Sequence, residues 1–189
     1  MNTLILGSKS PARKKILEYF QHPFIQVASH FDEDSILFNG DPEDYVQTLA
    51  LKKSEELHRQ FPESLILTAD TTVFCQGKIY NKPNDLQEAR TMLQELSGSW
   101  HTVYTGVVLR KGVEVVQQVE ATHVLMNLRS AEQINAYLAK NQWQEKAGGY
   151  TIQEGSGLLV NKIDGCYYNV MGLPINTLAY LFEKHKIPF

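Results

Sequence analysis

The chain has 189 residues, of which 43% are hydrophobic and 21% are charged. This composition is typical of a globular protein, and the length fits a single domain over residues 1–189 with a sizeable core. A formal net charge of −3 excludes the extended basic surface that nucleic-acid binding needs. The sequence has two cysteines, no apolar run near the roughly 18 residues of a membrane span and no secretory signal after Met1. We therefore expect a cytoplasmic protein that binds neither nucleic acid nor membranes.

The first half of the chain alternates short apolar runs with segments of helical periodicity. Ser10 and Pro11 are typical of the first positions of a helix, and so are Asp41 and Pro42. The expected elements are strands over residues 3–7, 24–27 and 64–69, a hairpin over 72–80, and helices over 10–20, 41–60 and 85–96.

The second half is expected to contain longer strands and more hairpins. Ser130 and Gln133 make a capping-box sequence that predicts the start of a helix, and Asp164–Gly165 predicts the turn of a hairpin. The other expected elements are strands over 100–109 and 113–126, a glycine-rich stretch over 147–157 and a last helix from Pro174. Because hairpins interrupt the alternation of strands and helices, we expect an α/β fold with a mixed twisted sheet flanked by helices. Residues 98–170 could form a second lobe of the same domain.

One charged residue interrupts the apolar face of the helix expected over 41–60. Lys53 lies four residues after Leu49 and four before Leu57, on the same face of the helix. A lysine at such a position extends its amine to solvent, pairs with a carboxylate or reaches into a cleft. The apolar face itself consists of Tyr45, Val46, Leu49, Ala50 and Leu57.

The loop between the first strand and the first helix has the residues of an anion site. The N-terminus of a helix presents free N–H groups, and Ser8, Ser10 and Arg13 add hydroxyl and guanidinium donors that suit a phosphate. The alternative is a capped helix with solvated basic side chains.

Two carboxylates are candidates for catalysis or metal binding. Asp70 follows the apolar run of residues 65–69 and is expected to end that strand, where it could act as a general base or bind a hard metal ion. Its alternative is to cap a turn through Thr71 or Thr72. Glu33 lies in the acidic stretch over 30–41, and it could share a divalent ion with Asp70 or be solvated.

Two further positions could contact a ligand. Lys82 follows the hairpin expected over 72–80 and could bind a phosphate, although loop lysines are commonly solvated. Gln153 ends a segment whose glycines would let the backbone approach a ligand, and its amide is a directional hydrogen-bonding group. The alternative for this segment is a plain loop and strand start. Taken together, the basic groups, carboxylates and small polar groups fit a polyphosphate ester with a divalent cation.

The sequence resembles the Maf family of nucleoside triphosphate pyrophosphatases over nearly its whole length and in the same order. The matching blocks are Ser-Lys-Ser-Pro-Ala-Arg at 8–13, Leu-Ala-Leu-Lys-Lys-Ser at 49–54, Ala-Asp-Thr at 69–71, Lys-Pro at 82–83, Leu-Ser-Gly at 96–98 followed by His101, Val103 and Thr105, Lys-Ala-Gly-Gly-Tyr-Thr-Ile-Gln at 146–153 and Val-Met-Gly-Leu-Pro at 170–174.

The resemblance implies a hydrolase, dependent on a divalent metal cation (Mg²⁺, Mn²⁺ or Co²⁺), that splits a nucleoside triphosphate into monophosphate and pyrophosphate. It implies two lobes around a deep nucleotide-binding cleft and a possible homodimer. The blocks at 69–71 and 146–153 are similar to the dTTP/UTP branch of the family. The implied roles are catalysis by Asp70, Glu33, Lys53 and Lys82, metal binding by Asp70 and Glu33, and substrate binding by Ser8, Ser10, Ala12, Arg13, Thr71 and Gln153, with Thr71 and Gln153 reading the base.

Ala12 departs from the family pattern, which has a second arginine at this position. Losing a guanidinium removes up to five donors from the site, and Lys9 or Lys14 can replace the charge without the bidentate fork. Two alternatives therefore stay open, namely hydrolysis of a modified nucleotide such as 7-methyl-GTP, and a weakly catalytic nucleotide-binding regulator of cell division.

Overall fold

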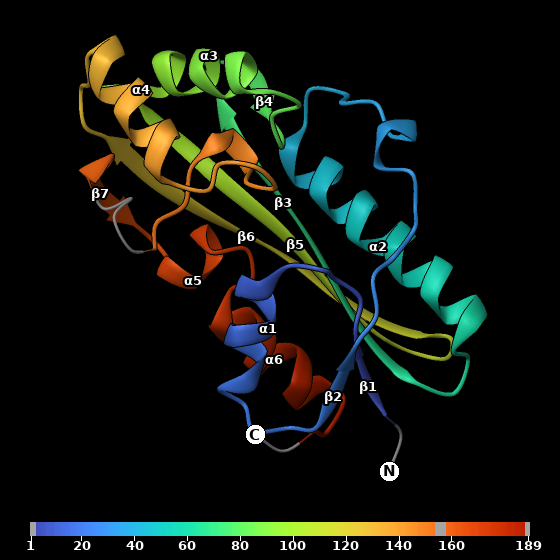
Figure 1. The fold of residues 1–189 in the computed structure, drawn as a ribbon. Coiled ribbons are helices and arrows are strands. Elements are labelled where there is room, and N and C mark those ends of the chain that lie inside the picture. The colour runs from blue at the N-terminus through green and yellow to red at the C-terminus, as the bar shows by residue number, and fades with distance from the viewer. Residues whose placement is uncertain (1–2, 154–157, 188–189) are drawn as a thin grey trace.

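The computed structural model describes residues 3–153 and 158–187, which form one seven-stranded mixed sheet with helices packed against it (Figure 1). The elements in chain order are β1 (Leu4–Leu6), α1 (Pro11–Glu18), β2 (Phe24–Gln26), the 3-10 turn η1 (Glu33–Ser35), α2 (Pro42–Gln60), β3 (Leu65–Cys75), β4 (Lys78–Tyr80), α3 (Leu86–Leu96), β5 (Trp100–Lys111), β6 (Glu114–Met126), α4 (Ala131–Lys140), the 3-10 turn η2 (Ala147–Gly149), β7 (Val160–Asp164), α5 (Tyr167–Val170) and α6 (Ile175–Lys184).

The sheet combines parallel and antiparallel pairs, as the sequence predicted. Its strand order is β2-β1-β3-β5-β6-β7, and β4 adds to β3. β1 runs parallel to both β2 and β3, whereas β3, β5, β6 and β7 pair with one another antiparallel. The mixed α/β fold flanked by helices is therefore confirmed.

The predicted helix starts are confirmed by their hydrogen bonds. The side chain of Ser10 accepts a bond from the backbone N–H of Arg13 at the start of α1, and the Asp41 carboxylate caps α2 in the same way. Ser130 and Gln133 form a complete capping box at α4. Among the described residues, no helix combines the length and the apolar character needed to cross a membrane.

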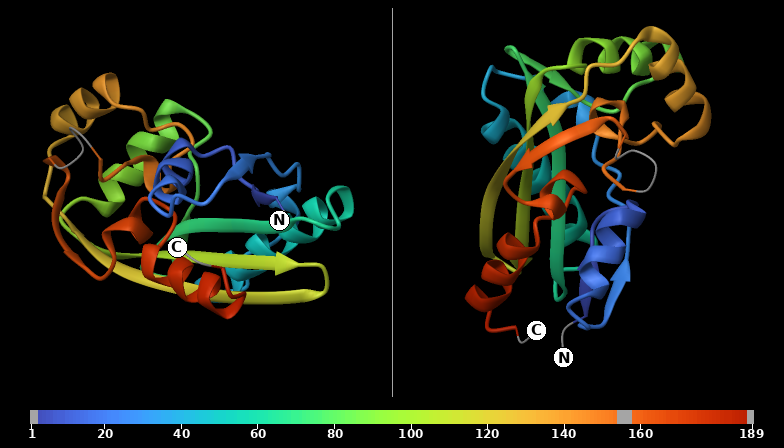
Figure 2. Two further views of the ribbon diagram at one scale, coloured as in Figure 1. Left: turned by 90° about the horizontal axis from the view of Figure 1, so that it is seen from below. Right: turned by 90° about the vertical axis from the view of Figure 1, so that its left-hand side faces the viewer.

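Two separate apolar cores pack on one face of the long strands. Leu67 and Ala69 of β3 belong to a core with α1 and α6, whereas Val73 and Cys75 of the same strand belong to a core with α3 and α4. Both views of Figure 2 show α3 and α4 at one end of the long strands. The helix α2 covers the opposite face through Leu57 and its neighbours. The space between the two cores lies beside the middle of β3.

Two details of the predicted fold are wrong. Asp70 does not end a strand, because β3 continues to Cys75 and pairs with β5 through Phe74. No second strand follows Asp164–Gly165 within the described residues, because the chain forms the short helix α5, where the buried amide of Asn169 donates to the carbonyls of β5 and β6. Of the predicted glycine-rich stretch, residues 154–157 lie outside the described residues.

Candidate functional site

The site lies where one edge of β3 has no strand beside it. On that edge β1 pairs with residues 65–67 and β4 with residues 73–75. Among the described residues, no strand pairs there with residues 68–72, although β5 accompanies them on the other edge. Side chains from both faces of β3 can therefore reach the same opening.

A cavity of about 310 Å³ opens beside this gap. Asp70 does not line it, but all the other predicted site residues do. These lining residues are Ser8, Ser10, Ala12, Arg13, Glu33, Lys53, Thr71, Lys82 and Gln153. The structure thus brings together side chains that are far apart in the sequence.

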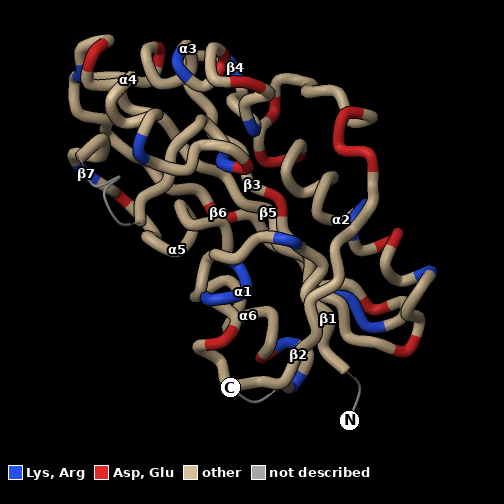
Figure 3. Tube along the Cα trace, viewed as in Figure 1, with Lys and Arg blue, Asp and Glu red and all other residues tan. Residues whose placement is uncertain are grey.

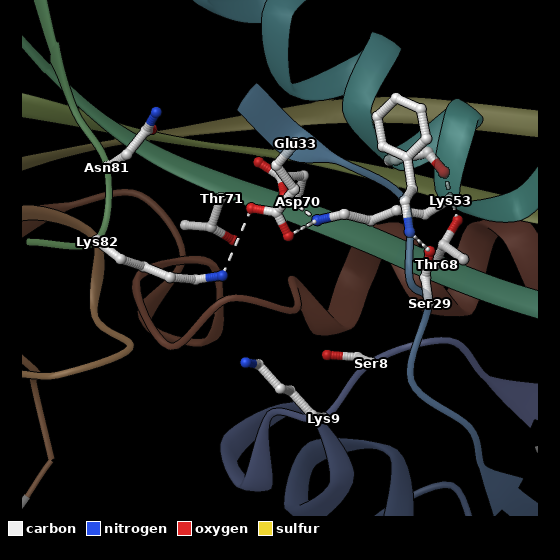
Figure 4. A network of polar contacts seen from close by, with 12 residues as sticks. Ser8, Lys9, Ser29, Glu33, Lys53, Thr68, Asp70, Thr71, Asn81 and Lys82 are labelled. Atoms are coloured by element: carbon white, nitrogen blue, oxygen red, sulfur yellow. Dashed lines mark hydrogen bonds and ion pairs between the residues drawn. The ribbon is translucent and has the colours of Figure 1, made fainter. Parts of the chain in front are cut away.

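Lys53 connects the cavity to Asp70. Its Nζ lies 2.5 Å from Asp70 Oδ1 and 2.8 Å from Glu33 Oε1, and the Lys53 and Asp70 side chains are both buried. Lys82 Nζ approaches the other Glu33 oxygen at 3.5 Å. Figure 4 shows both carboxylates pointing toward the Lys53 amine. Lys53 thus pairs with carboxylates and also reaches the cavity, which are two of the three alternatives for this residue.

The two lysines keep Glu33 ionised. Burial alone would raise the pKa of Glu33, but the ammonium groups of Lys53 and Lys82 outweigh burial and bring it below the ordinary value of 4.5. At neutral pH this carboxylate is therefore an anion.

Asp70 and Thr71 are adjacent in sequence but point to opposite faces of β3, as successive strand residues do. Asp70 meets Lys53 from α2, whereas the hydroxyl of Thr71 meets Arg13 from α1 at 2.9 Å. The Thr71 hydroxyl also lies 2.9 Å from that of Thr105 on β5. The strand therefore supplies the carboxylate on one face and a support for Arg13 on the other.

Arg13 is held on three sides. Its guanidinium donates from Nε to the carbonyl of Gly172 at 2.7 Å, from Nη1 to Ser8 Oγ at 3.3 Å and from Nη2 to Thr71. Burial lowers the pKa of Arg13, and the charges of Asp70 and Glu33 oppose that effect. These bonds use three of the five guanidinium donors and fix the plane of the group.

Gly172 is a supporting residue that the sequence did not identify by role. Its φ of +103° lies in the region that favours glycine, and an added Cβ would come within 3.4 Å of both Arg13 Nε and Thr71 Oγ1. In the sequence, the feature that pointed to Gly172 was its place in the matching block at 170–174. Its contact with Arg13 could not be foreseen, because the two residues are far apart in the sequence.

Lys9, Glu145 and Tyr150 also line the cavity. Lys9 and Glu145 form an ion pair there, with Nζ and Oε2 3.4 Å apart. The Tyr150 hydroxyl lies 2.6 Å from Nε2 of the buried His101, whose pKa burial lowers from 6.5 to about 4. His101 is therefore a neutral imidazole within the core.

The oxygen donors of the site suit a hard divalent ion only in part. Glu33 and Asp70 converge on one point, the Lys53 amine. Within residues 3–153 and 158–187, no group of three or more His, Cys, Asp or Glu side chains is placed to hold a metal. One or two carboxylates completed by substrate phosphates is the usual way in which proteins bind Mg²⁺.

Known proteins match this chain over almost its whole length. The family model described as "Maf-like protein" matches residues 3–185. A dTTP/UTP pyrophosphatase of Chlamydia felis is 45% identical over 185 residues, covering 97% of this chain and 94% of that protein. The dTTP/UTP pyrophosphatase of Latilactobacillus sakei is 42% identical over 180 residues, covering 95% and 99%. Among solved structures, a HAM1 protein from Coxiella burnetii matches with a TM-score of 0.46 at 11% identity, covering 67% of this chain and 73% of that one.

Proposed function

We propose that this chain, which belongs to the Maf family, is a nucleoside triphosphate pyrophosphatase that hydrolyses dTTP and UTP to the monophosphate and pyrophosphate. The observation that carries the proposal is the convergence of Arg13, Lys53, Lys82 and Glu33 at one cavity, with Asp70 paired to Lys53 directly behind its wall. Relatives named dTTP/UTP pyrophosphatase at 42% and 45% identity support the substrate.

In this proposal the cations bind the triphosphate. Arg13 and Lys82 both line the cavity and offer donors, and α1 presents its N-terminus with the hydroxyls of Ser8 and Ser10. Acidic and basic segments alternate along the tube in Figure 3. A few local cations within an acidic chain suit a single nucleotide, whereas a polymer would need an extended basic surface.

Asp70 would accept the proton of the attacking water. Lys53 orients the Asp70 carboxylate through their 2.5 Å ion pair, and a general base needs such a fixed position beside the reacting water. The water oxygen then bonds to the α-phosphorus, the bond to the bridging oxygen breaks, and pyrophosphate leaves. Lys82 and Arg13 neutralise the charge that develops on the leaving phosphates.

The proposed metal is Mg²⁺, Mn²⁺ or Co²⁺, held by Asp70 and Glu33 together with the phosphates. When bound, this ion supplies charge neutralisation and polarises the phosphorus centre. The two carboxylates fit it because they are close enough to share the Lys53 amine. In this proposal Glu33 would hold the metal, and Asp70 would both hold the metal and accept the proton.

Gln153 is the stronger candidate for reading the base. It lines the cavity, and its amide offers both a donor and an acceptor. The hydroxyl of Thr71 already contacts Arg13 and Thr105, so we propose that Thr71 acts on substrate choice through the position of Arg13.

A panel of dTTP, UTP and 7-methyl-GTP, each titrated with Mg²⁺, Mn²⁺ and Co²⁺, tests the function. The proposal predicts turnover of dTTP and UTP that depends on the metal and releases pyrophosphate. Preferred turnover of 7-methyl-GTP would support hydrolysis of a modified nucleotide. Binding of these nucleotides without turnover under any metal would support the regulator.

A further inference from the structure

One carboxylate oxygen lies between two lysines at the mouth of the cavity. Oε2 of Glu145 is 3.4 Å from Lys9 Nζ and 3.8 Å from Lys82 Nζ. Lys9 follows β1, Lys82 follows β4 and Glu145 precedes η2, so the three side chains come from different parts of the cavity wall. Figure 4 shows the Lys9 and Lys82 side chains reaching into the same space from opposite sides.

This arrangement is chemically that of a phosphate oxygen bound by two ammonium groups. Lysine binds phosphate as a compact point charge with three donors, and a carboxylate oxygen resembles a phosphate oxygen in charge and hydrogen bonding. Glu145 therefore marks a position where an anionic oxygen is stabilised from two sides.

We propose that Lys9 and Lys82 form a phosphate-binding site that the Glu145 carboxylate occupies until a polyphosphate displaces it. Lys9 then supplies the cation that Ala12 does not, because Lys9 lines the cavity whereas Lys14 borders a separate surface depression with Glu18 and His22. This inference deepens the proposed function, on which the identity of the polyphosphate rests.

The internal contact is suited to displacement. The Lys9 and Glu145 side chains are 69% and 59% exposed, and exposed ion pairs contribute little to stability. Glu145 adopts a φ of +61°, a left-handed conformation that is uncommon for a residue other than glycine. A polyphosphate carries more charge than one carboxylate and can also contact Arg13, so it competes effectively.

Calorimetric titration of the full chain with inorganic tripolyphosphate tests this without any turnover. Glu145→Gln removes the charge but keeps the length of the side chain, and binding should become about two- to fivefold tighter. Lys9→Met should weaken binding about three- to fivefold. Lys14→Met is the matched control, since it removes the same charge outside the cavity, and it should leave binding unchanged.

The two substitutions should also be coupled. In the Lys9→Met background, Glu145→Gln should tighten tripolyphosphate binding by a smaller factor. In that background, Lys82 is the one lysine of the pair that the substitution frees from Glu145. Weaker binding in Glu145→Gln, or equal effects of Lys9→Met and Lys14→Met, would overturn the proposal. Thymidine, which lacks phosphate, should bind all variants alike. Because tripolyphosphate has no base and the readout is binding, a failed pyrophosphatase assay would not by itself contradict this inference.

Discussion

Lys53 Nζ lies 2.5 Å from Asp70 Oδ1, and this contact joins the helix α2 to the middle of the strand β3. The two side chains are 8% and 9% exposed, so neither charge has water to compensate for a lost partner. The pair therefore does two things at once, because it stabilises the packing of α2 on the sheet and holds one carboxylate in place beside the cavity.

Replacing Asp70 by Asn should abolish most turnover while preserving the fold. Asn keeps the shape of the side chain but cannot accept a proton from water, so kcat should fall about 10²- to 10⁴-fold. Lys53 keeps Glu33 as a partner at 2.8 Å. The free energy of unfolding should therefore fall by only about 1–3 kcal/mol relative to the wild type. Pyrophosphate release from dTTP and thermal unfolding measure the two effects. Asp34→Asn, in the exposed turn η1, is the control, and near-normal turnover in Asp70→Asn would refute the base role.

Replacing Thr71 by Val should weaken the binding of the triphosphate by Arg13. Val fills the same space but offers no oxygen to Arg13 Nη2, so KM should rise about tenfold for dTTP and UTP alike. Steady-state kinetics with both substrates measure this, and Thr91→Val, on α3, is the control. A changed preference between dTTP and UTP with an unchanged KM for one of them would instead show direct base reading by Thr71.

Replacing Ala12 by Arg should restore the cation of the family pattern. Position 12 lines the cavity beside Arg13, so a new guanidinium would reach the phosphates and lower KM about tenfold. We expect the gain to be the same for dTTP, UTP and 7-methyl-GTP, because all three carry the same triphosphate. A gain confined to one base would assign position 12 to base recognition.

The burial of His101 predicts a loss of stability in mild acid. Its pKa is about 4 in the folded chain against 6.5 when exposed, so its contribution is complete above pH 6.5 and is lost as the pH falls toward 4. The linkage amounts to about 3 kcal/mol. The free energy of unfolding in urea should be lower for His101→Gln than for the wild type at neutral pH. The difference between the two proteins should shrink as the pH falls toward 4. A constant difference would mean that His101 protonates normally. The exposed His30→Gln variant is the control.

Local patterns in the sequence predicted much of the fold. The bounds of α2 and the place of Lys53 on its buried face follow from apolar spacing and from the cap at Asp41, all of which are short-range signals. The predicted end of β3 was wrong because Asp70 and the threonines after it are typical of a turn. The hydrogen-bond partners of these side chains lie elsewhere in the sequence, so the pattern around Asp70 does not show them.

The residues of the candidate site could be proposed from the sequence, but the contacts between them could not. The resemblance selected Lys53, Lys82 and Glu33 as site residues, yet nothing local shows that one lysine serves two carboxylates. The contact between Glu145 and the two lysines depends on how the segment before η2 folds over the cavity, which is a tertiary property.

Identifying the products of dTTP hydrolysis in water labelled with oxygen-18 tests the central claim most directly. The account predicts dTMP and pyrophosphate in equal amounts, with the label in dTMP, because water attacks the α-phosphorus. Asp70→Asn should form neither product at a comparable rate. Release of inorganic phosphate with dTDP, or label in the pyrophosphate, would contradict the proposed reaction.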